Sequence, residues 1–339
     1  MNAITEHISQ FRTWLGKQNR DGRWCILVSA DPDALASAMA LKRILRRRVQ
    51  SVTVARINAV TRPDNLAMIR YLRIATERWN WEQANIYSNF AIVDSQPGHS
   101  KAFTSLTYDL VIDHHPLTEL SLHTTQTCFA AVHPSLGATS SFMAKLLRAL
   151  GIRPGPLLAT ALLYGIRTDT DAFERSGSEE DLRSYQWLSH FANSNLLRRI
   201  CRSEYLRDWL PLFARAFNSL RDCRGGGAYA ALSKVGEADM LVAMADFFTK
   251  IHGLHWIAVS GVVGNQVIVI FRGDGGRDMG QMARDCFGPL GEAGGHRNLA
   301  RAEFSAGAVP HGIKPTDFVY KLLMGFRQHG SASQPGIKR

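Results

Sequence analysis

Carboxylate and imidazole side chains recur where short apolar runs give way to polar residues. Together they are the donors that a pair of divalent cations requires: oxygen ligands suit Mg²⁺ or Mn²⁺, and imidazole shifts the preference towards Mn²⁺. Two such ions can clamp a phosphoryl group and lower the pKa of a bound water. The residues concerned are Asp31, Asp33, Asp94, Asp113, His114, His115 and Asp169.

Each of these residues alone has a simpler explanation. An aspartate that ends a strand most often caps the helix that follows. The consecutive residues Asp113, His114 and His115 are harder to explain in this way, because a cap needs one polar side chain and not three. We therefore interpret the whole set as a candidate metal site.

The surrounding pattern predicts the elements that would bring these residues together. Unbroken apolar strands that alternate with helices indicate a parallel sheet covered on both faces, hence an α/β fold. Ligands of such sheets lie at the carboxyl ends of the strands, where the aspartates would be. The predicted strands are 24–28, 52–56, 90–93 and 110–112, and the predicted helices are 4–15, 34–47, 65–74, 140–150 and 157–164.

The length of 339 residues favours two domains, at about 150 residues per domain. We expect a metal-binding catalytic domain over 1–175 and a helical, arginine-rich linker over 176–224. A smaller α+β domain is expected over 225–330, with strand 228–232 and a hairpin of 255–263 and 266–272. A flexible tail would follow at 331–339.

Composition excludes several classes of protein and favours anionic partners. Hydrophobic residues make up 45% and charged residues 20% of the chain, which excludes a disordered or collagen-like protein. A net charge of +11 favours nucleic acid or phosphorylated metabolites. The longest apolar run, 157–166, is too short to span a bilayer. Five scattered cysteines without CxxC spacing, and no visible secretory signal, predict reduced thiols in a cytoplasmic protein.

Four motifs along the chain resemble those of the DHH phosphoesterase superfamily and occur in the same order as in that family. The central one is Val111-Ile112-Asp113-His114-His115-Pro116, which is similar to the signature that names the family. The shorter members, which this chain resembles in overall plan, act on very short oligonucleotides and on 3′-phosphoadenosine 5′-phosphate. The other matching segments are 31–37, 92–94 and 165–170, together with a helix start at 137–140 and the Gly294-Gly295-His296 motif of the DHH-associated C-terminal domain.

The resemblance implies a role for each matched residue. A metal-bound hydroxide would attack the phosphorus in the cleft between the two domains. The metal ligands would be Asp31 for the first ion, Asp33 for the second, Asp94 bridging both, and His114 and Asp169 as the remaining ligands of the second ion. The catalytic residues would be His115, near the substrate phosphate, and Asp113, which would support the imidazoles or the water. The other end of the substrate would be held by Arg272, Gly294, Gly295 and His296.

The first motif departs from the family pattern at one position. The family has a histidine ligand of the first metal four residues before the first aspartate, and this chain has Leu27 there. We expect a two-metal Mn²⁺ site, with Mg²⁺ as the alternative, whose first position is weakened. The first position would bind its ion only when substrate is present, or another side chain would replace the missing histidine as a ligand. The candidates for that side chain are His99, His123 and His133.

The function expected from these motifs is metal-dependent hydrolysis of phosphodiester or phosphomonoester bonds. The substrates would be short oligonucleotides, dinucleotides or nucleoside bisphosphates, with no membrane partner and with a homodimer as an allowed assembly. One alternative is a phosphoanhydride hydrolase acting on pyrophosphate or polyphosphate. The other is a catalytically impaired protein that binds a nucleotide and regulates a partner.

Overall fold

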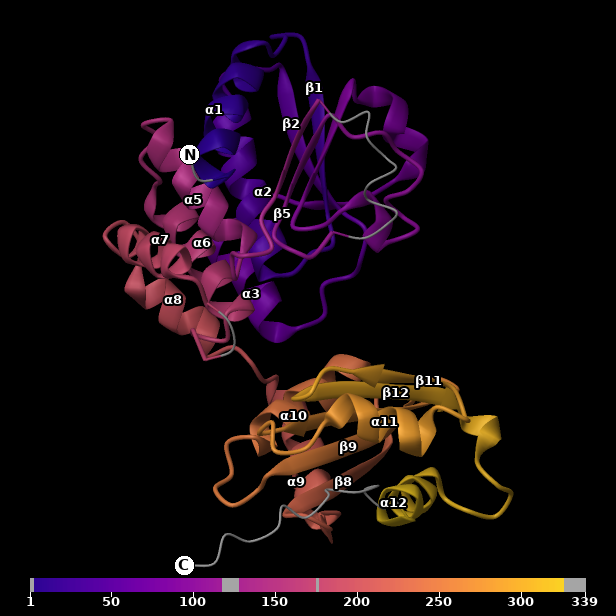
Figure 1. Ribbon diagram of the computed structural model, residues 1–339. Coiled ribbons are helices and arrows are strands. Elements are labelled where there is room, and N and C mark those ends of the chain that lie inside the picture. Colours follow the sequence, from indigo (N-terminus) through magenta and orange to yellow (C-terminus); the bar gives the residue numbers. More distant parts are fainter. Residues whose placement is uncertain (1–2, 118–127, 175–176, 326–339) are drawn as a thin grey trace, which may run out of the picture. The chain divides into compact units, whose positions relative to one another are not determined.

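A computed structural model describes residues 3–117, 128–174 and 177–325 of the chain (Figure 1). The chain divides into two compact units, Met1–Glu204 and Tyr205–Arg339. The segment 176–224, expected as a linker, is split at this boundary. Its helices α7 (Glu179–Ser189) and α8 (Ser194–Cys201) pack on the first unit, and α9 (Leu210–Asn218) packs on the second. The expected tail lies outside the described residues.

The first unit is built on a six-stranded, fully parallel sheet in the order β3-β2-β1-β4-β5-β6. The predicted α/β class is therefore confirmed. Two of its strands, β3 and β6, were not predicted from the sequence. The strands are β1 (Arg23–Val28), β2 (Ser51–Arg56), β3 (Glu77–Arg78), β4 (Asn89–Val93), β5 (Leu110–Asp113) and β6 (Phe129–Val132).

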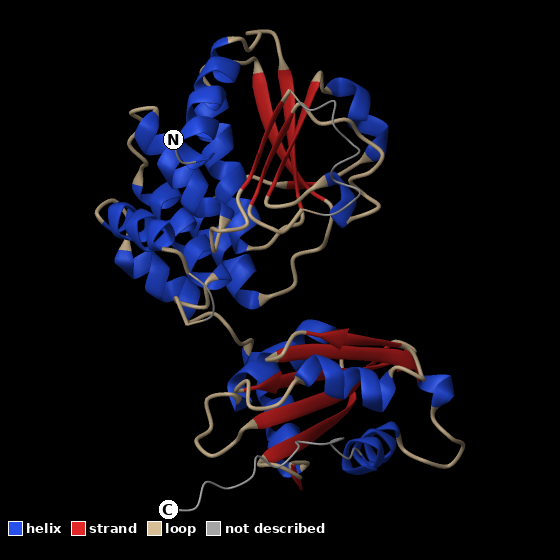
Figure 2. Cartoon of the chain, viewed as in Figure 1, coloured by secondary structure: helices blue, strands red, loops and turns tan. Residues whose placement is uncertain are grey.

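The two faces of this sheet are covered unequally. One face carries the main core, to which β1 contributes Ile26 and Val28, under a thick layer of helices (Figures 1 and 2). The other face is covered by short segments, where Leu27 packs with Phe103 and Tyr108. The helices are α1 (Ala3–Gly16), α2 (Pro32–Leu45), α3 (Pro63–Leu72), α5 (Thr139–Ala149) and α6 (Pro156–Asp169), with α7 and α8; the short turns are η1 (Trp81–Ile86) and η2 (Pro97–His99).

The second unit contains a mixed sheet in the order β11-β12-β10-β9-β8-β7, in which only the β8–β9 pair is parallel. Apolar clusters lie on both of its faces. The predicted hairpin is confirmed, as β9 pairs antiparallel with β10. The elements are η3 (Arg207–Trp209), α9, β7 (Arg221–Cys223), β8 (Gly227–Lys234), α10 (Ala238–Phe248), β9 (Trp256–Val263), β10 (Gln266–Gly273), α11 (Met279–Phe287), β11 (Glu292–Gly295), β12 (Leu299–Ser305), η4 (Ala306–Ala308) and α12 (Pro315–Gly325).

None of the helices in the described parts of the chain combines the length and the apolar character needed to cross a bilayer.

A pair of histidines, buried His133 and half-buried His7, joins α1 to the main core and makes stability depend on pH. Nδ1 of His7 lies 3.2 Å from Nε2 of His133. Burial lowers the pKa of His133 to about 4, and nearby His7 and Lys145 add to the effect. Because this value lies below the 6.5 of an ordinary histidine, the unfolded chain takes up the proton first as pH falls.

We therefore expect the free energy of unfolding to be unaffected by His133 above about pH 6.5. It should fall as the pH drops from there towards 4, with a total loss of about 2–3 kcal/mol. Urea unfolding at pH 7 and pH 5 measures this difference. His133→Gln should shrink it, whereas the exposed control His190→Gln should leave it unchanged. An equal pH response in wild type and His133→Gln would contradict the assignment.

Candidate metal centre

Four of the predicted ligands converge in the first unit. Asp33, Asp94, His114 and Asp169 each place one donor atom so that all four atoms lie within 4.8 Å of one another. Nε2 of His114 is 3.3 Å from Oδ2 of Asp169 and 3.6 Å from Oδ1 of Asp94. The four residues come from segments far apart in the chain, and this fits the predicted meeting of strand and helix ends at one edge of the sheet.

Asp33 is held by the start of another helix. It lies in the first turn of α2 and is completely buried. Its two carboxylate oxygens accept hydrogen bonds from the backbone N–H groups of Thr139, at 2.6 Å, and Ser140, at 2.8 Å. These donors belong to the first turn of α5, whose N-terminal dipole favours a negative charge. The helix start therefore fixes the carboxylate beside the other ligands.

Asp94 carries the clearest sign of a missing positive partner. It follows β4 with φ of 59°, a left-handed conformation that costs a non-glycine residue energy and is concentrated at functional sites. Its Oδ1 accepts a hydrogen bond from Oγ1 of Thr139 at 2.8 Å. Its Oδ2 is buried and has no hydrogen-bond partner among the described residues. An unpartnered buried carboxylate oxygen is costly, and a bound cation would remove that cost.

His114 presents the right nitrogen to this cluster. Its Nδ1 lies 3.2 Å from the carbonyl oxygen of Leu136, which can only accept, so Nδ1 carries a proton and Nε2 is the nitrogen that could bind an ion. Burial alone would lower the pKa of His114, but Asp169 and Asp33 raise it to about 9. Without a metal, a proton on His114 thus partly compensates the acidic cluster.

The carboxylates repel one another strongly. Burial, followed by the charges of Asp33, Asp31 and Asp169, raises the pKa of Asp94 well above its usual range. Burial, followed by the charge of Asp169, raises the pKa of Asp33 to about 6. Such mutual destabilisation is what a divalent cation would relieve, so these residues fit a metal ion of the hard-to-borderline type.

Asp31 is placed differently from the other four. It caps α2, and its Oδ1 accepts from the backbone N–H of Ala34 at 2.8 Å, as the simpler explanation requires. Although the residue is exposed, the protein around its carboxylate and the nearby Asp169 raise the pKa of Asp31 to about 7. The charge of Asp169 therefore acts on Asp31, and the role of Asp31 as a ligand of the first metal stays a prediction.

Asp113 and His115 form a second, adjoining arrangement. Nδ1 of His115 lies 2.8 Å from Oδ1 of Asp113. Gln96 donates from Nε2 to Oδ2 of Asp113 at 2.7 Å and to the carbonyl oxygen of His115 at 3.1 Å. Burial alone would raise the pKa of Asp113, but the hydrogen bonds from His115 and Gln96 hold it below its usual value. Asp113 is therefore an anion that orients His115.

The position of the missing family histidine offers no ligand. Leu27 is fully buried in the apolar cluster on the thinly covered face of the sheet. Among the candidate replacements, His133 is engaged with His7, and His123 lies outside the described residues. The ring of His99 lies against that of His115, with centroids 5.5 Å apart.

The predicted substrate-binding residues lie in the second unit. Arg272 is the penultimate residue of β10, and its Nε donates to Oδ1 of Asp246 at 2.7 Å. Gly294 and Gly295 end β11, and Gly295 has φ of 145°. A Cβ on Gly295 would collide with the neighbouring strand, so close strand packing explains this glycine without a ligand. His296 follows and is exposed. Substrate binding by these residues stays a prediction.

Several residues that support the site were not predicted. Thr139 bonds both Asp33 and Asp94, and Gln96 clamps the segment that carries His115. The helix start at 137–140 was noticed only as a family motif. Gln96 gives no signal in the sequence, because its partners become neighbours only when β4 and β5 pair.

Asn58 is a further supporting residue, and it yields a prediction. Its side chain accepts from the backbone N–H of Ala30 at 2.6 Å and donates to the carbonyl oxygen of the same residue at 3.3 Å. These two hydrogen bonds fix Ala30, the residue that precedes Asp31. We expect Asn58→Leu to lower turnover about 10–100-fold, as loss of a supporting shell typically does. Asn80→Leu removes a side chain that also accepts a backbone N–H, at the start of η1, and should have little effect on turnover. Equal losses of turnover in both variants would refute the positioning role of Asn58.

Residues 24–166 match the sequence model of the DHH family, N-terminal domain. An uncharacterized protein of Methanocaldococcus jannaschii is 31% identical over 281 residues, which cover 83% of this chain. The match covers only 57% of that relative's length. A crystal structure of an exopolyphosphatase-related protein from Bacteroides fragilis has a TM-score of 0.71 at 16% identity, with 94% of each chain covered, which shows a shared fold.

Proposed function

We propose that the chain is a metal-dependent phosphoesterase of the DHH family, and the match of residues 24–166 to the model of that family's N-terminal domain supports the proposal. The observation that carries the proposal is the unpartnered, buried Oδ2 of Asp94 within the cluster of Asp33, His114 and Asp169. A bound cation would offset the cost of gathering and burying these carboxylates. Phosphoryl transfer is the chemistry for which oxygen-rich, two-metal sites are widely used.

We assign Asp33, Asp94, His114 and Asp169 to the better-defined ion and Asp31 with Asp94 to the weaker one. Divalent ions there would supply neutralisation of phosphoryl oxygens and acidification of a bound water. Mn²⁺ is the ion we favour because an imidazole stands among the carboxylates, and Mg²⁺ is the alternative.

The chain's own residues would orient the phosphoryl group. His115 directs Nδ1 at Asp113, and this hydrogen bond raises the pKa of the His115 imidazole. A protonated Nε2 is then the donor available to a phosphoryl oxygen of the substrate. Its side chain is 44% exposed, so a phosphate can reach it, while that of Asp113 is completely buried. Asp113 therefore acts as a positioning residue, and His115 as the catalytic residue that contacts the phosphoryl group.

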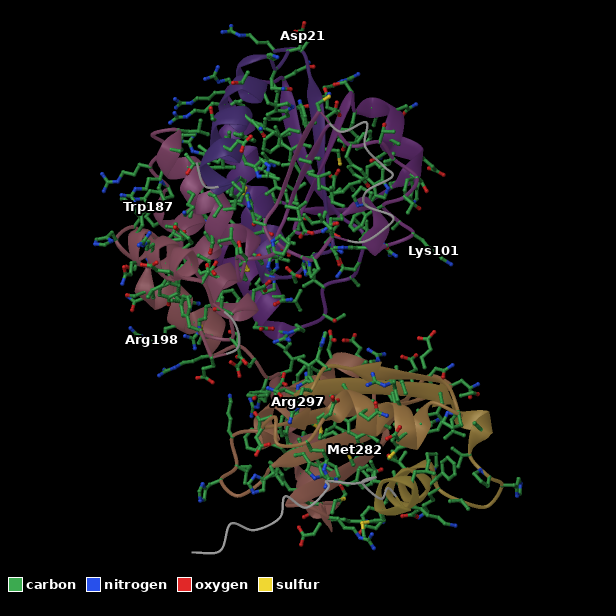
Figure 3. All side chains as sticks on the ribbon, viewed as in Figure 1. Asp21, Lys101, Trp187, Arg198, Met282 and Arg297 are labelled. Carbon is green, nitrogen blue, oxygen red and sulfur yellow. The ribbon has the colours of Figure 1, made fainter. Side chains whose placement is uncertain are left out.

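We propose short oligonucleotides, dinucleotides or nucleoside bisphosphates as substrates. The net charge of +11 supports an anionic substrate. Part of this charge belongs to exposed helix surfaces, such as Arg198 on α8, where it can attract polyanions without binding them specifically (Figure 3). Arg272 and His296 would grip the part of the substrate remote from the scissile bond.

The test is a substrate panel with Mn²⁺, with Mg²⁺ and with a chelator. The panel contains 3′-phosphoadenosine 5′-phosphate, a diribonucleotide, a five-residue RNA and pyrophosphate with polyphosphate. The last pair is included because the Bacteroides fragilis protein of the same fold is described as exopolyphosphatase-related. We expect metal-dependent release of a nucleotide or phosphate from one of the first three. Turnover of phosphoanhydrides alone would replace the proposed substrate class, and nucleotide binding without any turnover would favour the regulatory alternative.

A further inference from the structure

A third imidazole, that of His99, extends the row formed by His114 and His115. The rings of His114 and His115 have centroids 4.4 Å apart, and those of His115 and His99 5.5 Å apart. One donor atom from each of His99, Asp113 and His115 lies within 4.8 Å of the other two. His99 closes η2, which begins three residues after Asp94, and its side chain is accessible to solvent.

The hydrogen bonds of His99 decide which of its nitrogens carries a proton. The backbone N–H of Gln96 donates to Nδ1 of His99 at 3.3 Å, and Oγ of Ser95 lies 3.4 Å from the same nitrogen. A backbone N–H can only donate, so Nδ1 is the unprotonated nitrogen of the ring. The proton of the neutral imidazole is consequently on Nε2, which becomes a donor.

This tautomer is wrong for a metal ligand and right for binding an anion. A ligating imidazole gives its lone pair to the ion and keeps a proton on the other nitrogen, as His114 does against the carbonyl of Leu136. His99 has the reverse arrangement, because its lone pair is already used by the backbone of Gln96. His99 therefore does not take the place of the histidine that position 27 lacks.

We propose that His99 donates a hydrogen bond from Nε2 to a phosphoryl oxygen of the substrate, beside His115. The inference rests on the proposed function for the identity of the anion. The geometry requires only a tetrahedral oxyanion in contact with both rings, so inorganic phosphate and orthovanadate are suitable probes. His99 is then a substrate-binding residue from the loop after β4. It does not replace the metal-binding histidine that the family has at the position of Leu27.

The experiment compares His99→Leu and His99→Gln with wild type in the full chain. Calorimetric titration with Mn²⁺ should give the same stoichiometry and affinity in all three. Titration of the Mn²⁺-loaded protein with phosphate or orthovanadate should be weakened about 10–100-fold in His99→Leu, the usual effect of losing a hydrogen bond to a charged group. His99→Gln should recover part of the affinity, because its amide can accept from Gln96 and still donate.

The exposed residue His190 provides a matched control, and His190→Leu should bind both probes like wild type. Loss of Mn²⁺ binding in His99→Leu would overturn the proposal and make His99 a metal ligand. Unchanged phosphate affinity in a folded His99→Leu variant would also overturn it. Since neither titration requires turnover, a protein that binds phosphate through His99 but hydrolyses nothing would leave this inference standing while the proposed phosphoesterase function failed.

Discussion

Replacement of Asp94 by asparagine is expected to lower kcat/KM by at least about a thousandfold, because metal stabilisation of the transition state is worth several kcal/mol. Asp94 is the residue proposed to hold both ions, and its Oδ2 has no hydrogen-bond partner among the described residues. His114→Ala should have a comparable effect, since it removes the ring nitrogen Nε2 that lies beside Asp94 and Asp169. Steady-state kinetics on the substrate identified by the panel provide the measurement.

The Asp94→Asn variant should be more stable than wild type when no metal is present. The pKa of Asp94 is raised well above its usual range, so ionisation of its carboxyl group at pH 7 opposes folding. Asparagine keeps the acceptor for Thr139 and removes the charge. Asp94→Asn should therefore have a higher Tm than wild type in chelator, and Mn²⁺ should raise its Tm less.

Asp109→Asn is the matched control, because Asp109 precedes β5 and bonds the backbone of Phe90, away from the cluster. It should leave turnover and the Mn²⁺ response unchanged. If Asp94→Asn kept wild-type turnover, or if its Tm rose with Mn²⁺ as much as that of wild type, Asp94 would not be a metal ligand.

The second large effect is expected at Gly165, where α6 passes α2 and α5. A Cβ at this position would lie 2.6 Å from Oγ of Ser140 and 3.0 Å from both Cα and Oδ1 of Asp33. Gly165→Ala must therefore push Asp33 or Ser140 aside. Because small displacements of a catalytic group cost about a hundredfold in rate, we expect turnover to fall by about that factor.

Stability should change much less than activity in this variant. Overpacking costs about 1–3 kcal/mol, and alanine recovers about 1 kcal/mol of helix propensity. Gly16→Ala, at the end of α1 with open space around its Cβ, is the control for a helical glycine. Equal turnover in Gly165→Ala and wild type would show that the approach of α6 to Asp33 does not position the site.

The elements that the sequence predicted are those with a strong local signal. The buried strands β1, β4 and β5 are unbroken apolar runs, α2 is rich in apolar residues, and α6 contains an apolar run too long for a strand. β12 was missed because its inward residues include two alanines, Ala300 and Ala302, which favour strands weakly. The split of the segment 176–224 was missed because helical periodicity does not reveal which core a helix will join.

The candidate site shows the same division. Asp33, Asp94, His114 and Asp169 were found because their residue types and motif spacing are visible in the sequence, and the fold brings them together. What could not be predicted are the hydrogen bonds that connect distant segments. The hydrogen bonds from Thr139 to Asp33 and Asp94 require α5 to start beside α2 and β4. That arrangement is a property of packing and not of the local sequence pattern.

The most direct test of the account is anomalous diffraction from crystals soaked with Mn²⁺. We predict a Mn²⁺ peak about 2.0–2.4 Å from donor atoms of Asp33, Asp94, His114 and Asp169, with Oδ2 of Asp94 among the ligands. The Asp94→Asn variant should lose that peak. Crystals that show Mn²⁺ only elsewhere on the protein, with these four side chains bonded to one another, would contradict the claim that they form a metal centre.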